Sequence, residues 1–431
     1  MHAIERYYKI NRIILKLVGL WPYHQSYFSQ LLKVLFVSIL VTFIFAQLLP
    51  FTTQQYNTSL LFQVLSFVFP ILIDTTKYCL FIIQANNLKR LLDQIQDDWN
   101  SLKDKFEIKI IKKYACNARL FSIVVMIYCY FGLLSCGIVQ FLPIILDVLL
   151  PLNDSRPHYL LVATEYFVSQ EKYFHLMLLH EALAYIIGTT ALCGTSAIIM
   201  TCILHACALF KIASCRIENA IKKSTLMIPS PKREYFIYRK VVHAVIMHQK
   251  ASKFVELLTS SFGTLFSILI ILGVSSLTFN LFQFLQLITL TKNTGQASMV
   301  AILILLHLNY MFVANYGGQE LLNHGLKMFK TTYNGLWYAV PLRTQKLLLF
   351  IMQKETLNIG LTCGGIFVIS LEGFATVKNS LCGLFNSEKP QIFMFNCTDL
   401  DTIFFFSACK RGSILFHVDL FRKIKIRIKS K

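Results

Sequence analysis

The sequence predicts an all-α polytopic membrane protein with seven transmembrane helices, its amino terminus cytoplasmic and its carboxy terminus extracellular. The first observation is composition: 55% of the 431 residues are hydrophobic and 15% are charged, whereas soluble domains carry about 25% charged residues. The second is that the apolar residues form blocks near the ~20 residues that a helix needs to cross a bilayer. The third is an uneven placement of Lys and Arg between these blocks. A soluble all-α protein is the weaker alternative.

The seven apolar blocks are separated by loops of alternating character. The first block follows a stretch interrupted by Arg6, Lys9, Arg12 and Lys16, so we expect no signal peptide and expect that block to serve as its own insertion signal. The expected spans are 31–49, 60–83, 120–142, 182–209, 262–290, 298–315 and 359–377.

The cations fix the expected orientation. The segment before the first span and those after the second, fourth and sixth spans hold most of the Lys and Arg residues, and the other loops hold almost none. Cation-rich loops stay in the cytoplasm, so the amino end is expected inside, the reverse of a G-protein-coupled receptor. The segments 84–117 and 210–260 show helical spacing, so we expect spans four and five to extend into the cytoplasm and to pack there.

The net charge of +20 belongs to this pattern. In a soluble protein such a charge would indicate nucleic-acid binding. Here the cations lie beside the spans and face anionic headgroups, so the expected partner is the lipid bilayer, with no nucleic acid.

Two sequons agree with this orientation. Asn57 and Asn153 both lie in N-x-S/T sequences within loops that the charge pattern places outside. Both are expected glycosylation sites.

No motif of an enzyme is present. The twelve cysteines show neither a CxxC nor zinc-ligand spacing with histidine. His180-Glu181 begins like a zinc-protease motif, but position 184 is Ala where HExxH needs a second histidine. We therefore expect no catalytic residue, no metal and no cofactor.

Charged residues within the spans allow two interpretations. Asp74 and Lys77 are three residues apart and share a helix face, so they form either a structural pair or part of a proton or ion relay. Glu372 is expected to be the most buried acid by position, and it either lines a cation pathway or bonds a neighbouring helix.

Aromatic and polar residues in the outer halves of the spans form a candidate ligand site. Most aromatic residues of such spans pack helices or anchor them at the interface, yet a pocket for a small apolar ligand has the same composition. Asn280 is one further polar residue that could orient such a molecule. The candidate ligand-binding residues are Phe67, Phe69, Cys136, Gln140, Tyr185, Thr189, Phe279 and Phe282.

The segment 318–374 resembles the carboxy-terminal signature of insect odorant receptors, most closely those of ants and other Hymenoptera, and Gly19-Leu20-Trp21-Pro22 resembles the amino-terminal pattern of that family. The resemblance covers about 60 residues by motif and most of the chain by span count and loop lengths. The signature residues are Gly318, Gln319, Tyr333, Trp337, Tyr338, Pro341 and Gln345, followed by Leu371-Glu372-Gly373-Phe374.

The resemblance implies an odorant-gated, non-selective cation channel in the plasma membrane of olfactory neuron dendrites. Such receptors assemble as hetero-tetramers with a shared co-receptor, bind a small volatile odorant between the middle spans, and line the pore with the last span. This chain lacks the long insertion of the co-receptor, so it resembles a tuning subunit. The implied pore and gating residues are Glu372, Phe374 and Leu381.

The carboxy end departs from the family pattern. The likeness holds to about Ser380 and breaks at Leu381, and a basic stretch follows. We therefore divide the chain into a receptor domain at 1–380 and an atypical tail at 381–431, and our hypothesis is that the tail is translated intron from a mispredicted gene.

Three other functions remain as alternatives. A gustatory-type ligand-gated channel is the nearest, and the 318–374 block argues against it. A seven-span G-protein-coupled receptor has the opposite orientation and would carry DRY and NPxxY motifs, which are absent. A transporter would show internal repeats and broken helices, and the sequence shows neither.

Overall fold

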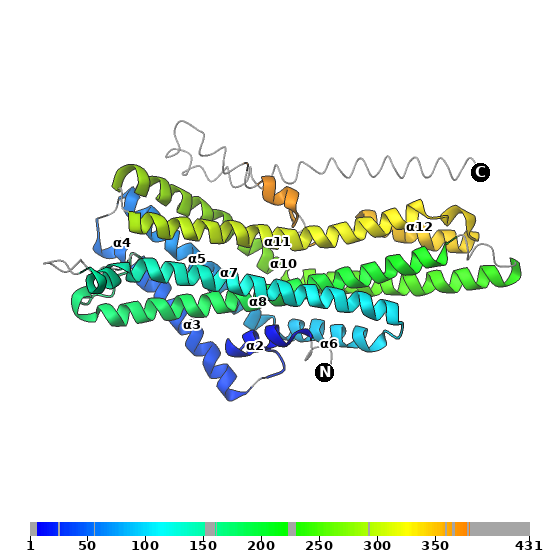
Figure 1. Ribbon diagram of the computed structural model, residues 1–431, viewed down its shortest axis with the longest axis horizontal. Coiled ribbons are helices and arrows are strands. Elements are labelled where there is room, and N and C mark those ends of the chain that lie inside the picture. Colours follow the sequence, from blue (N-terminus) through cyan, green and yellow to red (C-terminus); the bar gives the residue numbers. More distant parts are fainter. Residues whose placement is uncertain are drawn as a thin grey trace. The chain divides into compact units, whose positions relative to one another are not determined.

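The computed structural model describes residues 7–24, 26–55, 57–150, 160, 162–222, 230–291, 294–357, 360–363, 367–376 and 379, and these are almost entirely helical (Figure 1). The α-helices are α2 (Lys9–Leu17), α3 (Tyr27–Leu48), α4 (Pro50–Thr53), α5 (Thr58–Ile83), α6 (Ala85–Ser101), α7 (Lys105–Leu149), α8 (Gln170–Ala220), α10 (Ser230–Gln286), α11 (Thr294–Asn334) and α12 (Leu342–Leu357). The remaining elements are the π-helical η1 (Leu287–Thr291), the 3-10 helix η2 (Trp337–Ala339), and the strands β1 (Thr362–Cys363) and β2 (Phe367–Val368).

Six helical stretches in the described part of the chain are long and apolar enough to cross a membrane, and they correspond to the first six expected spans. They are Tyr27–Thr53, Thr58–Ile83, Lys105–Leu142, Lys172–Ala220, Arg233–Leu290 and Thr294–Asn334. The α8 and α10 helices run for 51 and 57 residues, which confirms that spans four and five continue well beyond a bilayer's thickness.

The seventh expected span differs from the prediction. Where one helix was expected over 359–377, β1 and β2 pair antiparallel, with Thr362 opposite Val368, and a helical turn covers 371–376. The sequence gives the reason: glycines at 360, 364 and 365 each disfavour a helix by about 1 kcal/mol, and the β-branched residues around them favour strands.

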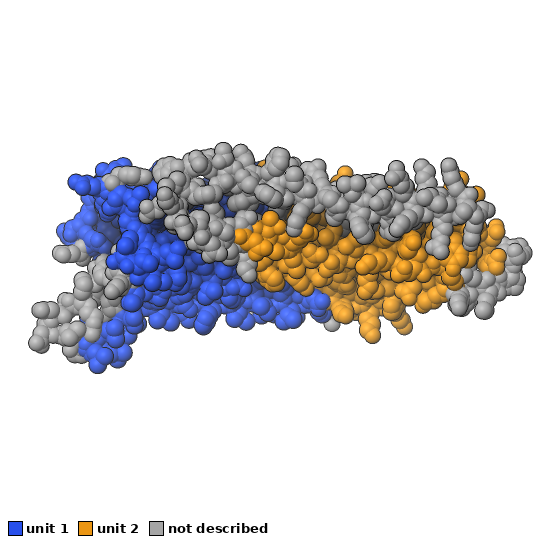
Figure 2. All heavy atoms as spheres, turned by 90° about the horizontal axis from the view of Figure 1, so that it is seen from above, with its two compact units in different colours: residues 1–101, 115–202, 265–311 blue, residues 102–114, 203–264, 312–431 orange. Residues whose placement is uncertain are grey.

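The chain divides into two compact units (Figure 2). Unit 1 comprises Met1–Ser101, Ala115–Cys202 and Leu265–Met311, and unit 2 comprises Leu102–Tyr114, Ile203–Thr264 and Phe312–Lys431. Each of the long helices α7, α8, α10 and α11 contributes residues to both units.

Unit 1 is held together around α5. Its first turn is capped by Asn57, whose side-chain oxygen accepts a hydrogen bond from the Leu60 backbone N–H at 2.6 Å. The apolar residues that follow at helical spacing pack against the end of α3 and against the loop before α8. This core cluster consists of Leu60, Val64 and Val68, with Leu48, Phe51, Leu72 and Ala163 around it.

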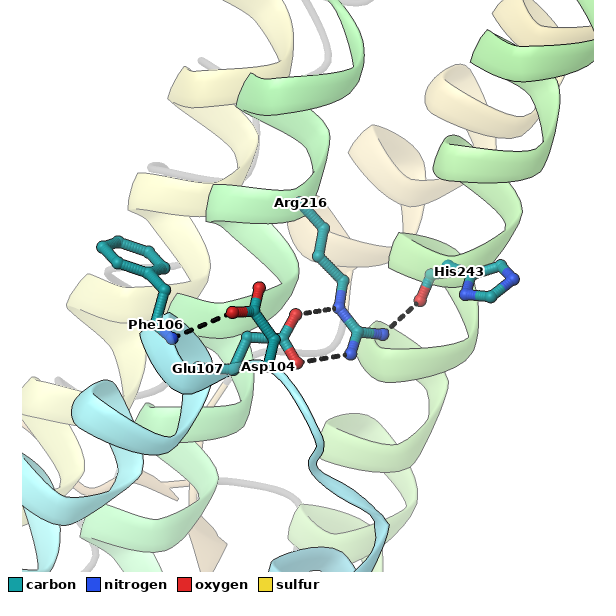
Figure 3. A network of polar contacts seen from close by, with 5 residues as sticks. All are labelled: Asp104, Phe106, Glu107, Arg216 and His243. Carbon is teal, nitrogen blue, oxygen red and sulfur yellow. Dashed lines mark hydrogen bonds and ion pairs between the residues drawn. The ribbon is translucent and has the colours of Figure 1, made fainter.

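Unit 2 contains a bidentate ion pair that joins three of its helices (Figure 3). The Arg216 guanidinium on α8 donates to both carboxylate oxygens of Glu107 on α7, at 2.6 and 2.8 Å, and to the carbonyl oxygen of His243 on α10, at 2.9 Å. One side chain therefore links three helices, with the planar geometry that makes arginine–carboxylate pairs strong.

Candidate functional site

The phenylalanines of the candidate ligand site pack in pairs between α5 and α10. Phe69 and Phe279 have ring centroids 5.0 Å apart, and Phe62 stacks on Phe282 at 5.3 Å. Phe67 lies on another face of α5 and is fully buried. The structure thus brings together Phe69, Phe279 and Phe282, and separates Phe67 from them.

Asn280 has a structural role through its side-chain nitrogen, while its Oδ1 atom is buried without a hydrogen-bond partner among the described residues. Its side-chain nitrogen donates to the carbonyl oxygen of Ser66 on α5 at 3.0 Å and to that of Ser276 on α10 at 2.8 Å. Both hydrogens of the amide are therefore committed to the backbone.

Two further candidates, Cys136 and Tyr185, lie where α3, α7 and α8 meet. Together with Gln47 and Glu181 they form a group that we call the polar cluster. The Tyr185 ring packs edge-on against Phe43 of α3 at 5.5 Å. The Gln47 amide lies close to the Tyr185 hydroxyl, and Glu181 and Cys136 act on that hydroxyl electrostatically. Three helices therefore direct polar groups to one place in an apolar region.

Several polar atoms of this cluster have no hydrogen-bond partner among the described residues. They are the amide nitrogen and oxygen of Gln47, the Oε2 atom of Glu181 and the hydroxyl of Tyr185. Gln47 is fully buried and Glu181 is 4% exposed. A buried polar atom without a partner costs about 1–3 kcal/mol, and native proteins rarely leave such groups unsatisfied. The cluster therefore has hydrogen-bonding capacity that the described residues do not use.

The remaining candidates lie near this cluster on the same helices. Gln140 on α7 is buried, and Thr189 on α8 is half-buried. The neighbouring residue Thr190 exchanges a hydrogen bond with Tyr130 of α7 at 2.8 Å, which fixes the register between α7 and α8.

Sequence reasoning missed Gln47 and Glu181. Glu181 was assigned to the loop before span four, because that span was expected to begin at 182, whereas α8 begins at Gln170 and carries Glu181 into the buried helix. Gln47 lies near the end of an otherwise apolar span. A buried amide or acid within a span is itself the signal that could have identified both residues.

The charged residues of α5 do not contact one another directly. Lys77 donates to the Ser196 hydroxyl on α8 at 2.6 Å and to the Tyr310 hydroxyl on α11 at 3.4 Å. Asp74 lies against Gly188, where an added Cβ would meet its Oδ2 atom at 2.7 Å. The two side chains therefore form no direct pair: Lys77 links α5 to α8 and α11 by hydrogen bonds, and Asp74 packs against α8.

Residues of the 318–374 motif hold the last described segment against α11 within unit 2. At Gly318, an added Cβ would lie 2.1 Å from the carbonyl oxygen of Ile369, so only glycine fits. The side-chain oxygen of Gln319 accepts from the Leu371 backbone N–H at 3.3 Å. Phe374 packs edge-on against Phe312 of α11 at 5.9 Å.

The other signature residues shape the turn between α11 and α12. Gln345 donates to the carbonyl oxygens of Tyr338 and Val340, at 3.1 and 2.7 Å. The carbonyl of Pro341 accepts from the first turn of α12. Trp337 packs edge-on against Tyr338, and Tyr333 stacks on Phe329.

Glu372 is exposed, so the expectation that it is the most buried acid is wrong. The buried acids in the described part of the chain are Asp74, Asp98, Glu107 and Glu181. Glu372 is exposed because it lies on the outer side of the turn whose inner side docks on α11. Leu381 and Asn153 lie outside the described residues, and Asn57 is exposed at the start of α5.

Comparison with known proteins identifies the family. The family model described as 7tm Odorant receptor matches residues 57–381. No curated protein matches the sequence. Two solved structures of the insect olfactory receptor OR5 from Machilis hrabei share the fold at 14% identity.

The first of these, in complex with eugenol, has a TM-score of 0.72 and covers 88% of this chain and 97% of its own. The second has a TM-score of 0.64 and covers 91% and 98%. These similarities confirm the all-α polytopic fold class and the family that the motifs predicted. The chain is a multi-pass membrane protein and belongs to the 7tm odorant receptor family.

Proposed function

We propose that this olfactory receptor is the tuning subunit of an odorant-gated, non-selective cation channel, which works as a hetero-tetramer with a shared co-receptor. The observation that carries the proposal is the family match over residues 57–381. The likeness to a receptor whose structure holds eugenol supports a small volatile ligand. The expected location is the plasma membrane of olfactory neuron dendrites, with the amino terminus cytoplasmic and the carboxy terminus extracellular.

We assign odorant binding to two neighbouring parts of unit 1. Phe69, Phe279 and Phe282 supply an apolar wall between α5 and α10, and Phe67 adds an apolar ring on another face of α5. Cys136, Gln140, Tyr185 and Thr189 supply polar groups from α7 and α8. Pockets of this composition suit small apolar molecules with one polar group.

Gating is assigned to the segment that the signature residues hold against α11. Glu372 and Phe374 lie on this segment, and Leu381 follows it in the sequence. An exposed acid on a pore-lining segment attracts cations, and the exposure of Glu372 in a single subunit is compatible with a pore formed between subunits.

A recording from cells that express this chain with a co-receptor tests the proposal. We expect an odorant-evoked cation current that persists when G-protein signalling is blocked and disappears without the co-receptor. A current that requires G protein would instead support a seven-span G-protein-coupled receptor.

We also propose that residues 381–431 are foreign to the receptor, because the likeness to the family pattern breaks at Leu381 and the family match extends no further. In that case the gating assignment rests on Glu372 and Phe374 alone. Sequencing of the transcript tests this. A spliced message that encodes the basic tail would contradict the proposal, and a message with a different carboxy end would support it.

A further inference from the structure

The polar cluster contains buried hydrogen-bonding atoms that have no partner in the described part of the chain, which a pocket for purely apolar odorants would not need. Gln47 of α3 and Glu181 of α8 are both more than nine-tenths buried. Three atoms of these two side chains lack a hydrogen-bond partner among the described residues. Buried polar groups in native proteins are otherwise almost always paired, so these atoms are available to a ligand that enters the cluster.

The geometry brings these side chains to one place. Glu181 and Tyr185 are one turn apart on α8, and Phe43 packs edge-on against the rings of both His180 and Tyr185, at 5.6 and 5.5 Å. Gln47 lies one turn after Phe43 on the same helix and close to the Tyr185 hydroxyl, yet no hydrogen bond of normal geometry joins the two.

The neighbouring His180 already makes two hydrogen bonds. His180 bonds the Tyr166 hydroxyl at 2.9 Å through Nδ1 and the Thr42 hydroxyl at 3.1 Å through Nε2. Both ring nitrogens therefore have hydrogen-bond partners, and His180 has no nitrogen left to bond Glu181. No lysine or arginine in the described part of the chain pairs with Glu181. The Glu181 carboxyl is thus the group of this cluster most in need of a donor.

We propose that the polar cluster recognises odorants whose apolar body ends in a hydrogen-bond donor, a hydroxyl or an amine, with Glu181 accepting that donor and Gln47 and Tyr185 binding the same head group. This inference rests on the proposed odorant binding and adds its chemical class. A site built to bond a donor rejects the analogue that lacks it, because its own polar atoms then stay unpaired.

The test uses pairs of probes that share a carbon skeleton. Straight-chain and benzylic alcohols and amines are each compared with the aldehyde and the hydrocarbon of the same skeleton, by current in the receptor–co-receptor complex. We expect the donor-bearing member to be roughly tenfold more potent, as the loss of one good hydrogen bond implies. Equal potency within the pairs would overturn the inference.

Two substitutions at Glu181 separate the roles of charge and hydrogen bonding. Glu181→Gln keeps a carbonyl acceptor and removes the ionisable carboxyl, which can form an ion pair with a bound amine, so we expect amines to lose about tenfold in potency and alcohols less than about threefold. Glu181→Leu and Gln47→Leu remove the polar atoms, so alcohols and amines should both fall to the potency of the hydrocarbon. Glu218→Gln, at an exposed position on the same helix, is the matched control and should change nothing.

Thermal unfolding of the purified full chain separates this inference from the channel function. Donor-bearing probes should raise the melting temperature of the wild type and not that of Glu181→Leu, even if no current is ever recorded. Without a probe, Glu181→Leu should melt no lower than the wild type, because an apolar residue replaces an unpaired polar one. A lower melting temperature together with no probe effect would assign the cluster a purely structural role and overturn the proposal.

Discussion

The side chain of Asn280 on α10 donates a hydrogen bond to the carbonyl oxygen of Ser66 on α5, and that carbonyl is the one that Pro70 leaves unpaired. Proline has no backbone N–H, so the oxygen four residues before it loses its helical partner. Pro70 lies inside α5, and Ser66 is fully buried. At 3.0 Å, the asparagine amide replaces the missing donor and joins the two helices at the level of the stacked phenylalanines.

This relationship predicts a dependence between two positions. Asn280→Leu should lower the free energy of unfolding by about 1–3 kcal/mol, since the Ser66 carbonyl then stays buried without a partner. In a Pro70→Ala background the new backbone N–H can bond that carbonyl, so the cost of Asn280→Leu should shrink. Thermal unfolding of the four variants in detergent measures this coupling. An equal cost in both backgrounds would show that Asn280 acts in another way.

Gly318 predicts a steric effect in unit 2. Gly318→Ala places a methyl group against the Ile369 backbone, where an added Cβ lies 2.1 Å from the oxygen and 2.8 Å from the carbon. Because backbone must move, we expect a loss of about 1–3 kcal/mol of stability and a weaker odorant response.

Gly273→Ala on α10 is the matched control, since nothing lies within 4 Å of the Cβ that this substitution adds. It should be neutral or slightly stabilising. Equal melting temperatures for the Gly318→Ala and Gly273→Ala variants would refute the close approach.

The Arg216–Glu107 pair predicts that a positive charge at position 216 does not by itself give the receptor its full stability (Figure 3). Arg216→Lys keeps the charge but loses the fork that holds both carboxylate oxygens and the His243 carbonyl. We expect it to lower the free energy of unfolding by about 1–2 kcal/mol, and Arg216→Ala to lower it further. The measurement is the melting temperature of the purified receptor, with Lys222→Ala at an exposed site near the end of α8 as control. A lysine variant as stable as the wild type would exclude a role for the bidentate geometry.

Glycosylation tests the proposed orientation. Asn57 caps α5 through its side-chain oxygen, so the sequon is better removed by Ser59→Ala than by changing Asn57 itself. If the loops that contain Asn57 and Asn153 are extracellular, glycosidase should increase the gel mobility of the wild type. Ser59→Ala and Ser155→Ala should each abolish one glycan, and the double variant both. An unglycosylated wild type from a glycosylating host, with an amino-terminal tag accessible on intact cells, would reverse the orientation.

Part of the fold was predictable because it follows from local chemistry. The apolar blocks gave the first six spans, since their length matches the bilayer core, and helical spacing beyond spans four and five predicted their extension. The seventh span was predicted as a helix because hydropathy alone favours one there. The structure has strands instead, since glycines and β-branched residues between Gly360 and Ile369 weaken a helix.

The candidate site divides in the same way. Residue type pointed to Tyr185 and to the phenylalanines of α5 and α10, but Asn280 proved to be a partner of the Ser66 backbone. Glu181 was missed because the true start of α8 lies eleven residues before it.

The sequence by itself determined the membrane fold and the family, because hydropathy, charge placement and the motif at 318–374 are properties of neighbouring residues. Only the tertiary structure decided which polar groups find partners. Asn280 meets Ser66 across 214 positions of the chain. Gln47 and Glu181 both lie near Tyr185, and three of their side-chain atoms have no hydrogen-bond partner among the described residues. Such pairings depend on which helix faces pack together, and that is set by the whole bundle.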